Sequence, residues 1–305
     1  MTILLMFLQL LLAFAFAPLF DGICRNLRAK IQSRRGYPIF QTYYDLLKLL
    51  SRGRTRPESG GLFFSLTPFL LFALSAAFLM LIPAAFGNID HTSNLSNIFV
   101  IVYLLAAWRF VFGVASVSSG NPFAVVGASR ESLIALYVEP AFIACLAICG
   151  FLASNSNLVE IKSQLLLGSF GYAQPSYALA AVVFLWACFV ETGRKPFDLA
   201  EADQEVQEGV LAEYSGRDLA LFETAMLLKQ YGLLTLFVTL FVPFAFQNAA
   251  LNLLFVTALV GLLWVGGILI DNFGPRFKII SSLKFKSFCM LSLTALALFF
   301  YIIGA

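Results

Sequence analysis

Long, uninterrupted apolar stretches constrain this chain more than any other feature of its sequence. Eight of them are present, at residues 2–20, 62–87, 97–118, 129–152, 176–193, 218–246, 251–272 and 285–304. A helix of about 20 residues crosses a hydrocarbon core of about 30 Å. Charged residues make up only 12% of the chain, against about 25% in soluble domains, so a soluble fold could not bury this surface. Continuous rather than alternating stretches favour helices over barrel strands. The sequence predicts an all-α integral membrane protein with about eight transmembrane helices.

The positive charges predict the orientation of these helices. Seventeen of the twenty Lys and Arg residues lie in or beside the odd-numbered loops. Loops that are rich in Lys and Arg stay in the cytoplasm, so both termini are expected outside. The net charge of +3 reflects this topology and does not indicate nucleic-acid binding. We expect one polytopic membrane domain over residues 1–305, with cytoplasmic loops at 21–61, 119–128, 194–217 and 273–284.

The first cytoplasmic loop is too long for a simple turn. Its stretch QTYYDLLKLL places Tyr43, Leu46, Leu47 and Leu50 on one helical face. This spacing predicts a short amphipathic helix in the membrane interface. The basic cluster before it suits anionic lipid headgroups or an acidic partner protein, and the residues do not choose between the two.

Several ionisable residues lie within the apolar stretches. Glu139, followed by Pro140, is about 15 Å from the cytoplasmic end of its stretch at 1.5 Å per residue, which is mid-membrane. In the first interpretation these groups form buried ion pairs that fix helix packing, such as Glu139 with Lys229 or Arg109. In the second they form a proton relay. The members expected in such a path are Glu139, Glu131, Lys229, Glu223 and Asp271.

A cytoplasmic segment concentrates the acidic residues. In ETGRKPFDLAEADQEVQEGVLAEYSG, residues 191–216, seven residues are acidic and only Arg194 and Lys195 are basic. Asp198, Glu201, Glu205 and Glu208 recur at helical spacing, where like charges repel one another. Such a stripe is typical of a solvated loop or of a docking surface for a basic partner, and both remain open here.

The chain offers no metal-ligand set of its own. Its five cysteines are scattered without a C-x-x-C motif, and it has one histidine. Cys145 and Cys149 lie one helical turn apart, but small buried core residues are the expected role of this pair. We therefore expect no metal, iron–sulfur cluster or other cofactor on this chain.

The acidic segment resembles a cytoplasmic loop of the complex I subunit 1 family, the NADH dehydrogenase subunit 1 family, at the same spacing. The stretches SSGNPFAVVGASRESLIALYVEPAF and RRGYPIFQTYYDLLKLLSR are more similar to the membrane subunit of energy-converting [NiFe]-hydrogenases. Formate hydrogenlyase subunit 4 and its hydrogenase-4 counterpart represent that branch. The chain departs from the family pattern at Asp203, where Glu is usual, and at the RRGYP turn.

The resemblance implies a non-catalytic subunit that anchors an oxidoreductase complex and contributes a proton path. The expected partners are a hydrogenase-like large subunit and an iron–sulfur small subunit on the cytoplasmic side, antiporter-like membrane subunits, and lipids of a prokaryotic inner membrane. The [NiFe] centre and iron–sulfur clusters would lie on those partners. In one rival interpretation the chain is the quinone-site subunit of a complex I-like NADH:quinone oxidoreductase, or belongs to a hydrogenase-related complex that lacks nickel. In the other it is a purely structural anchor.

The resemblance also assigns roles to particular residues. Glu139 falls on a buried glutamate of the proton path. A coupling loop that faces the peripheral subunits comprises Glu191, Arg194, Asp198, Glu201, Asp203, Glu205, Glu208 and Glu213. An interface with a partner or a quinone cavity comprises Arg34, Arg35 and Arg130.

Overall fold

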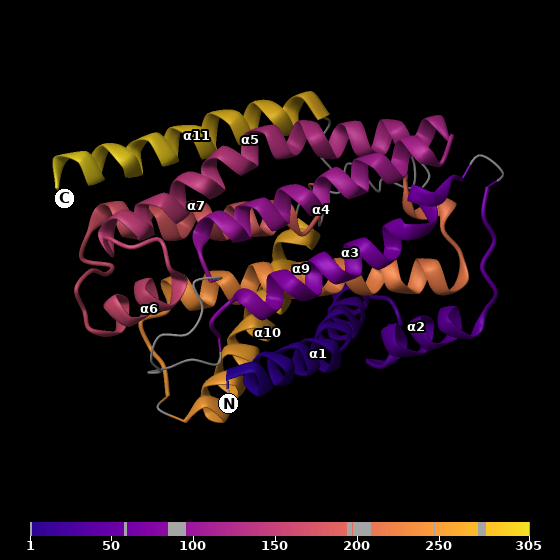
Figure 1. The fold of residues 1–305 in the computed structure, drawn as a ribbon, viewed down its shortest axis with the longest axis horizontal. Coiled ribbons are helices and arrows are strands. Elements are labelled where there is room, and N and C mark those ends of the chain that lie inside the picture. The colour runs from indigo at the N-terminus through magenta and orange to yellow at the C-terminus, as the bar shows by residue number, and fades with distance from the viewer. Residues whose placement is uncertain are drawn as a thin grey trace.

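The chain folds into a bundle of helices (Figure 1). The computed structural model describes residues 2–57, 60–84, 96–193, 197, 209–246, 248–273 and 279–304. Its elements are α1 (Thr2–Ile31), α2 (Gln41–Ser51), α3 (Leu62–Leu81), α4 (Ile98–Ser118), α5 (Pro122–Leu152), α6 (Leu158–Leu166), α7 (Pro175–Glu191), the 3₁₀ turn η1 (Leu211–Glu213), α9 (Gly216–Phe241), α10 (Ala249–Phe273) and α11 (Ile279–Ile303). No strand occurs among these described residues.

The predicted fold class is confirmed. Six helices are long and apolar enough to cross a membrane: α1, α3, α4, α5, α9 and α10. Two shorter apolar helices, Pro175–Glu191 and Cys289–Ile303, fall on the other two predicted spans. Each of the eight apolar stretches therefore corresponds to a helix.

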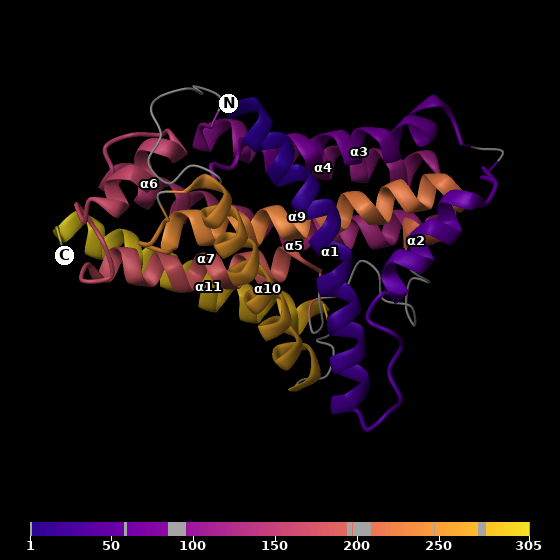
Figure 2. The ribbon, with the colours of Figure 1, turned by 90° about the horizontal axis from the view of Figure 1, so that it is seen from below.

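Helix α9 forms the centre of the bundle. It contacts α1, α2, α3, α6, α7 and α10, and 78% of its most apolar window is buried, the largest share among the six long helices. Figure 2 shows α9 crossing the middle of the molecule, between α3 and α7. Gly232 permits this packing, because a Cβ there would lie 2.6 Å from the ring of Phe78 on α3. Polar groups on α9 are consequently held away from lipid.

Two helices continue beyond the apolar stretches that predicted them. Helix α1 runs to Ile31, into the expected first loop, and Asp21 and Arg25 form an i,i+4 ion pair of 2.8 Å there. Helix α5 begins at Pro122, where the expected third loop lies. The Asn121 side chain caps it by accepting a hydrogen bond from the Phe123 amide at 2.9 Å. Polar residues suit the interfacial ends of helices that exceed the hydrocarbon thickness.

The predicted helix in the first loop is present as α2, but its apolar side is divided. Leu46 is buried, whereas Leu47 and Leu50 are exposed. Helix α2 packs against α1 and α9, with the Thr42 hydroxyl donating to Asp21 at 2.9 Å and Arg217 Nε donating to the Leu50 carbonyl at 3.1 Å. One part of the helix faces the bundle, and the exposed leucines are available to the membrane interface.

Hydrogen bonds and ion pairs join the segment after α2 to the start of α9. The Thr55 amide donates to Ser215 Oγ at 2.8 Å, and Arg54 and Arg56 flank the buried carboxylate of Asp218 at 3.7 and 3.6 Å. Gly216 adopts a φ of 55°, and a Cβ there would lie 2.2 Å from the carbonyl oxygen of Gly53. Only glycine fits both the backbone conformation and the close approach.

Gly216→Ala is therefore expected to destabilise the protein by about 1–3 kcal/mol, within the range for strain at a positive-φ position. Gly171→Ala is the matched control, because a Cβ at Gly171 meets no atom within 4 Å. Thermal unfolding of both variants in the same detergent measures the difference. Equal unfolding temperatures for the two variants would show that this contact does not constrain the fold.

A short helix that the sequence analysis did not anticipate, α6, lies in the expected fourth loop. Its residue Lys162 is 3% exposed, and burial lowers the pKa of its ammonium group from 10.5 to about 8. The folded protein therefore holds this proton less tightly than the unfolded chain does. Stability should rise as the pH increases from about 8 to 10.5, because the unfolded state binds more protons in that window.

Lys162→Met is expected to stabilise the protein at pH 7 by up to about 3 kcal/mol, at about 1.4 kcal/mol per pKa unit. The gain should disappear as the pH approaches the ordinary lysine value of 10.5. Unfolding temperatures measured from pH 7 upward test this, with Lys48→Met as the control at an exposed lysine of α2. A gain that persists unchanged at high pH would exclude the cost of a buried charge as its cause.

Candidate functional site

Four charged side chains from four helices meet inside the bundle. We call them the charge cluster: Arg109 of α4, Glu139 of α5, Glu191 of α7 and Lys229 of α9. Arg109 is paired with Glu139, and its Nη2 lies 3.2 Å from Glu191 Oε1. Glu191 Oε2 lies 3.3 Å from Lys229 Nζ. Acid and base therefore alternate in one chain from α5 to α9.

Glu191 is the central member of the charge cluster because it contacts both cations. It is the last residue of α7, which Thr192 and Gly193 terminate, the glycine with a φ of 63°. A negative charge at the carboxyl end of a helix is unfavourable, and two cations offset it here. Gln230 supports the same end by donating its Nε2 hydrogen to the Thr192 carbonyl at 2.9 Å. Lys229 and Gln230, which are adjacent on α9, therefore both contact the carboxyl end of α7.

An aromatic side chain holds the buried end of the cluster. Lys229 Nζ lies 4.2 Å from the ring centre of Trp108, a cation–π distance. Trp108 Nε1 in turn donates a hydrogen bond to Ser75 Oγ of α3 at 3.0 Å. The side chains of Glu191 and Lys229 are each 6% exposed. The side chains at this end of the cluster are therefore buried inside the chain.

The other end of the cluster opens into a cavity between α4 and α5. Arg109 and Glu139 line it, together with apolar residues and Ser118 and Ser132, and its volume is about 630 Å³. The Glu139 side chain is 38% exposed, against 13% for Arg109. The chain of ion pairs thus leads from a buried carboxylate at the end of α7 to an accessible carboxylate on the bundle's flank.

The cluster contains two acids and two bases, so its formal charge is zero when all four are ionised. In such an arrangement the desolvation of each member is offset by the oppositely charged neighbours that it contacts. Removing one partner of a buried pair costs about 3–5 kcal/mol. Arg109 is one of the two partners expected for Glu139, whereas Lys229 pairs with Glu191 instead.

Of the remaining residues expected in a proton path, Glu131 and Glu223 lie on helices of the charge cluster, whereas Asp271 lies on α10. Glu131 is half-buried in α5, and Glu223 is half-buried in the first half of α9. Asp271 lies in the last turn of α10, and its side chain is outside the described part of the chain. Of the five residues predicted for the proton path, Glu139 and Lys229 belong to the charge cluster.

The coupling loop is described only at its two ends. Glu191 belongs to the charge cluster, and Glu213 of η1 accepts a hydrogen bond from Asn121 Nδ2 at the start of α5. A carboxylate at a helix amino terminus is favourable, so Glu213 anchors the loop to α5. Arg194, Asp198, Glu201, Asp203, Glu205 and Glu208 lie outside the described residues.

The basic residues expected at an interface come from two parts of the chain, the turn after α1 and helix α5. Arg34 and Arg35 are exposed in the turn after α1, where the Arg34 amide bonds the Ala29 carbonyl at 2.8 Å. Arg130 is half-buried in α5. Over the described ranges, no group of three or more His, Cys, Asp or Glu side chains is arranged to hold a metal ion.

Sequence reasoning placed Glu191 in the loop and did not link it to the membrane path. The signal was present, because Glu191 belongs both to the apolar stretch 176–193 and to the acidic segment 191–216. Trp108 and Gln230, each adjacent to a charged residue within an apolar stretch, were also missed. Neighbours of an intramembrane charge are the residues to inspect, since they share its depth.

Comparisons with known proteins agree with this architecture. A family model described as "NADH dehydrogenase" matches residues 2–302. Hydrogenase-4 component C of Escherichia coli K12 is 40% identical over 258 residues, which cover 84% of this chain and 81% of that protein. Formate hydrogenlyase subunit 4 of the same strain is 35% identical over 274 residues, covering 88% of each chain.

Relatives also occur in a respiratory branch. NADH-ubiquinone oxidoreductase chain 1 of Triticum aestivum is 30% identical over 250 residues, covering 77% of this chain and 73% of that protein. Among solved structures, a chain of the membrane-bound sulfane sulfur reductase, an archaeal respiratory membrane complex, superposes with a TM-score of 0.85 at 22% identity. The match covers 97% of this chain and 98% of the other and supports the fold. The chain belongs to the NADH dehydrogenase subunit 1 family, with the membrane subunits of hydrogenase-4 and formate hydrogenlyase and complex I subunit 1 as its homologues.

Proposed function

We propose that this chain is the membrane-anchoring and proton-path subunit of an energy-converting [NiFe]-hydrogenase complex of the formate hydrogenlyase type. The observation that carries the proposal is the charge cluster, which connects the start of the acidic segment to a carboxylate at the flank of the bundle. The higher identity to the hydrogenase-4 and formate hydrogenlyase subunits than to the respiratory chain supports the hydrogenase branch.

The proposed path works by exchange of ion-pair partners. Arg109 lies between two carboxylates, so a change of charge at Glu191 alters how strongly Arg109 is held by Glu139. Charges in a dry interior interact more strongly than in water. A protonation event in the acidic segment would therefore shift the balance at Glu139 without a large backbone movement. Glu131 on α5, Glu223 on α9 and Asp271 on α10 are proposed as further members of the path.

The proposal places partners on two faces. A hydrogenase-like large subunit and an iron–sulfur small subunit would dock on the acidic segment from the cytoplasm and hold the [NiFe] centre and clusters. Antiporter-like membrane subunits would cover the cavity between α4 and α5, where Glu139 is exposed. Both termini would lie outside a prokaryotic inner membrane, and Arg34, Arg35 and Arg130 would contribute to the cytoplasmic interface.

The proposal is tested by isolating the native complex in mild detergent through a tag on this chain. We expect hydrogen evolution from reduced viologen at a rate that follows the nickel content of the preparation. Quinone reduction without nickel or hydrogen would contradict the hydrogenase branch and support a complex I-like NADH:quinone oxidoreductase.

The role of the coupling loop is tested separately. Replacing Glu201 and Glu205 with Gln is expected to abolish turnover, or uncouple it from proton movement, while the complex still assembles. The physical reason is that neutral loop residues no longer change the field at Glu191. Asp45→Asn on α2 serves as the control for a cytoplasmic carboxylate outside the loop. Full coupled activity in the loop variant would refute the assigned role.

A further inference from the structure

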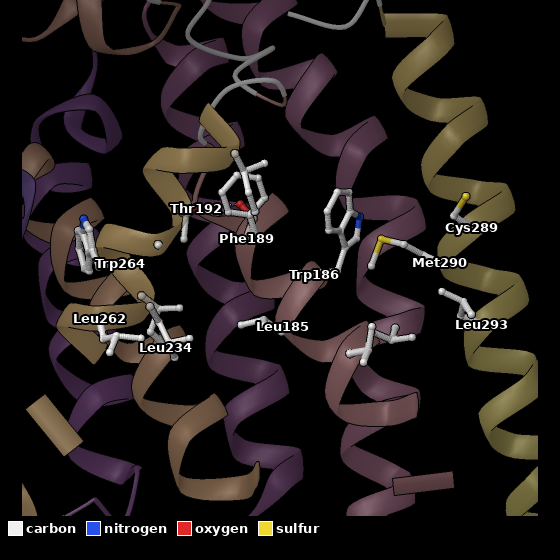
Figure 3. A pocket seen from close by; sticks show the side chains of 16 residues that line it. Leu185, Trp186, Phe189, Thr192, Leu234, Leu262, Trp264, Cys289, Met290 and Leu293 are labelled. Atoms are coloured by element: carbon white, nitrogen blue, oxygen red, sulfur yellow. Dashed lines mark hydrogen bonds between the residues drawn. The ribbon is translucent and has the colours of Figure 1, made fainter. Parts of the chain in front are cut away.

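A second cavity lies between a different set of helices from those around the charge cluster's opening. Helices α7, α9, α10 and α11 enclose about 480 Å³ there, and apart from Thr192 every residue that lines it is apolar. Figure 3 shows Leu262 and Trp264 on one side, Cys289, Met290 and Leu293 on the other, and Trp186 and Phe189 between them. This volume and lining are typical of a site for an apolar ligand.

The cavity exists because the last two long helices pack on different neighbours. Helix α10 packs against α1 and α9, whereas α11 packs against α5 and α7. The floor of the resulting gap is buried, with Val183, Leu234 and Trp264 each less than 8% exposed. Its rim is exposed and equally apolar, with Val182 at 60% and Leu262 at 67%. The cavity therefore opens sideways, between membrane helices, toward hydrocarbon.

The extent of the cavity matches one leaflet of a bilayer. Along α7 and its C-cap the lining runs from Val182 to Thr192, a rise of about 15 Å over ten steps of 1.5 Å. That is half of a hydrocarbon core of about 30 Å. Thr192 follows the end of α7 that leads into the acidic segment. In the orientation proposed above, the cavity lies in the cytoplasmic leaflet.

Depth and chemistry together identify the occupant. Water needs several polar partners, and this lining offers few beyond Thr192. A transmembrane helix of a partner would need a groove across both leaflets. A lipid tail needs one leaflet only. The sequence from residue 271 to residue 288, which separates the lining residues of α10 from those of α11, carries four basic residues and one acidic residue, Asp271. Basic segments at the cytoplasmic end of membrane helices attract anionic headgroups.

We propose that the cavity between α7, α9, α10 and α11 binds an acyl chain of an anionic phospholipid from the cytoplasmic leaflet. The complex is purified in mild detergent, and its bound phospholipids are counted by native mass spectrometry and lipid extraction. Gly266→Phe fills the cavity from α10, where an added Cβ meets no atom within 4 Å. We expect this variant to lose one anionic phospholipid per complex, with occupancy at least about fivefold lower. Gly171→Phe, at an equally open position outside the cavity, should retain it.

A crosslinking measurement on the unmodified chain makes the test independent of how the variants fold. Phosphatidylglycerol with a photoreactive group in its acyl chain should label peptides that contain Trp186, Met290 or Leu293. The same probe with a phosphatidylethanolamine headgroup should label them at least about fivefold less. Equal labelling by both probes, labelling spread evenly over the membrane surface, or a crosslink to another subunit at these residues would overturn the proposal. Unchanged lipid content in Gly266→Phe would also overturn it.

Discussion

Replacing Glu191 with Gln is expected to have the largest effect of any single substitution in the membrane region. Glu191 contacts both Arg109 and Lys229, so its removal leaves Lys229 without the carboxylate that offsets its burial. Breaking a buried ion pair in this way costs about 3–5 kcal/mol. We expect less assembled complex, a lower unfolding temperature, and loss of proton movement in the fraction that assembles.

Asp45→Asn is the matched control for the Glu191 substitution. Asp45 also pairs with an arginine, Arg25 at 3.2 Å, but both side chains are about 40% exposed. Surface pairs of this kind contribute only about 0–1 kcal/mol. Similar losses of stability in the two variants would show that the charge cluster is not buried in the assembled complex.

Glu139→Gln should separate coupling from stability. Glu139 is 38% exposed, and Arg109 keeps its contact with Glu191 when Glu139 is neutralised. The complex should therefore assemble normally. Proton movement should fall by about a hundredfold, at the lower end of what a positioned proton-transfer group contributes.

The measurement for Glu139→Gln is the change of internal pH in vesicles that contain the complex, recorded together with hydrogen evolution. Glu160→Gln on α6, on another part of the chain, controls for loss of an acidic side chain. Wild-type proton movement in Glu139→Gln would support the interpretation of this chain as a structural anchor.

The sequence alone was sufficient for the fold because apolar length dominates it. Each continuous stretch predicted a helix, and QTYYDLLKLL predicted α2 from spacing alone. The ends of α1 and α5 were predicted less well, since polar residues such as Arg25 and Asn121 extend or cap helices outside the hydrocarbon. Helix α6 was not predicted because it is only nine residues long and is flanked by a polar, glycine-containing loop.

The site was predictable in its members but not in its pairings. Depth along a helix placed Glu139 near the middle of the membrane, where a charge requires a partner. Which cation meets which carboxylate depends on the rotation of α4, α5 and α7 around α9, and one sequence does not contain that information. Glu191 shows the consequence: its position at the end of α7 becomes meaningful only once Arg109 and Lys229 are seen on either side.

The most direct test of the proton path is a charge-balanced double variant, Glu191→Gln with Lys229→Met. It removes one acid and one base and leaves Arg109 with Glu139, so the penalty of an uncompensated buried charge is relieved. We predict that this variant recovers most of the stability and assembly lost in Glu191→Gln, while proton movement per hydrogen evolved in vesicles stays at least about tenfold below wild type. Proton movement at the wild-type ratio in the double variant would contradict the account and show that the charge cluster only holds the helices together.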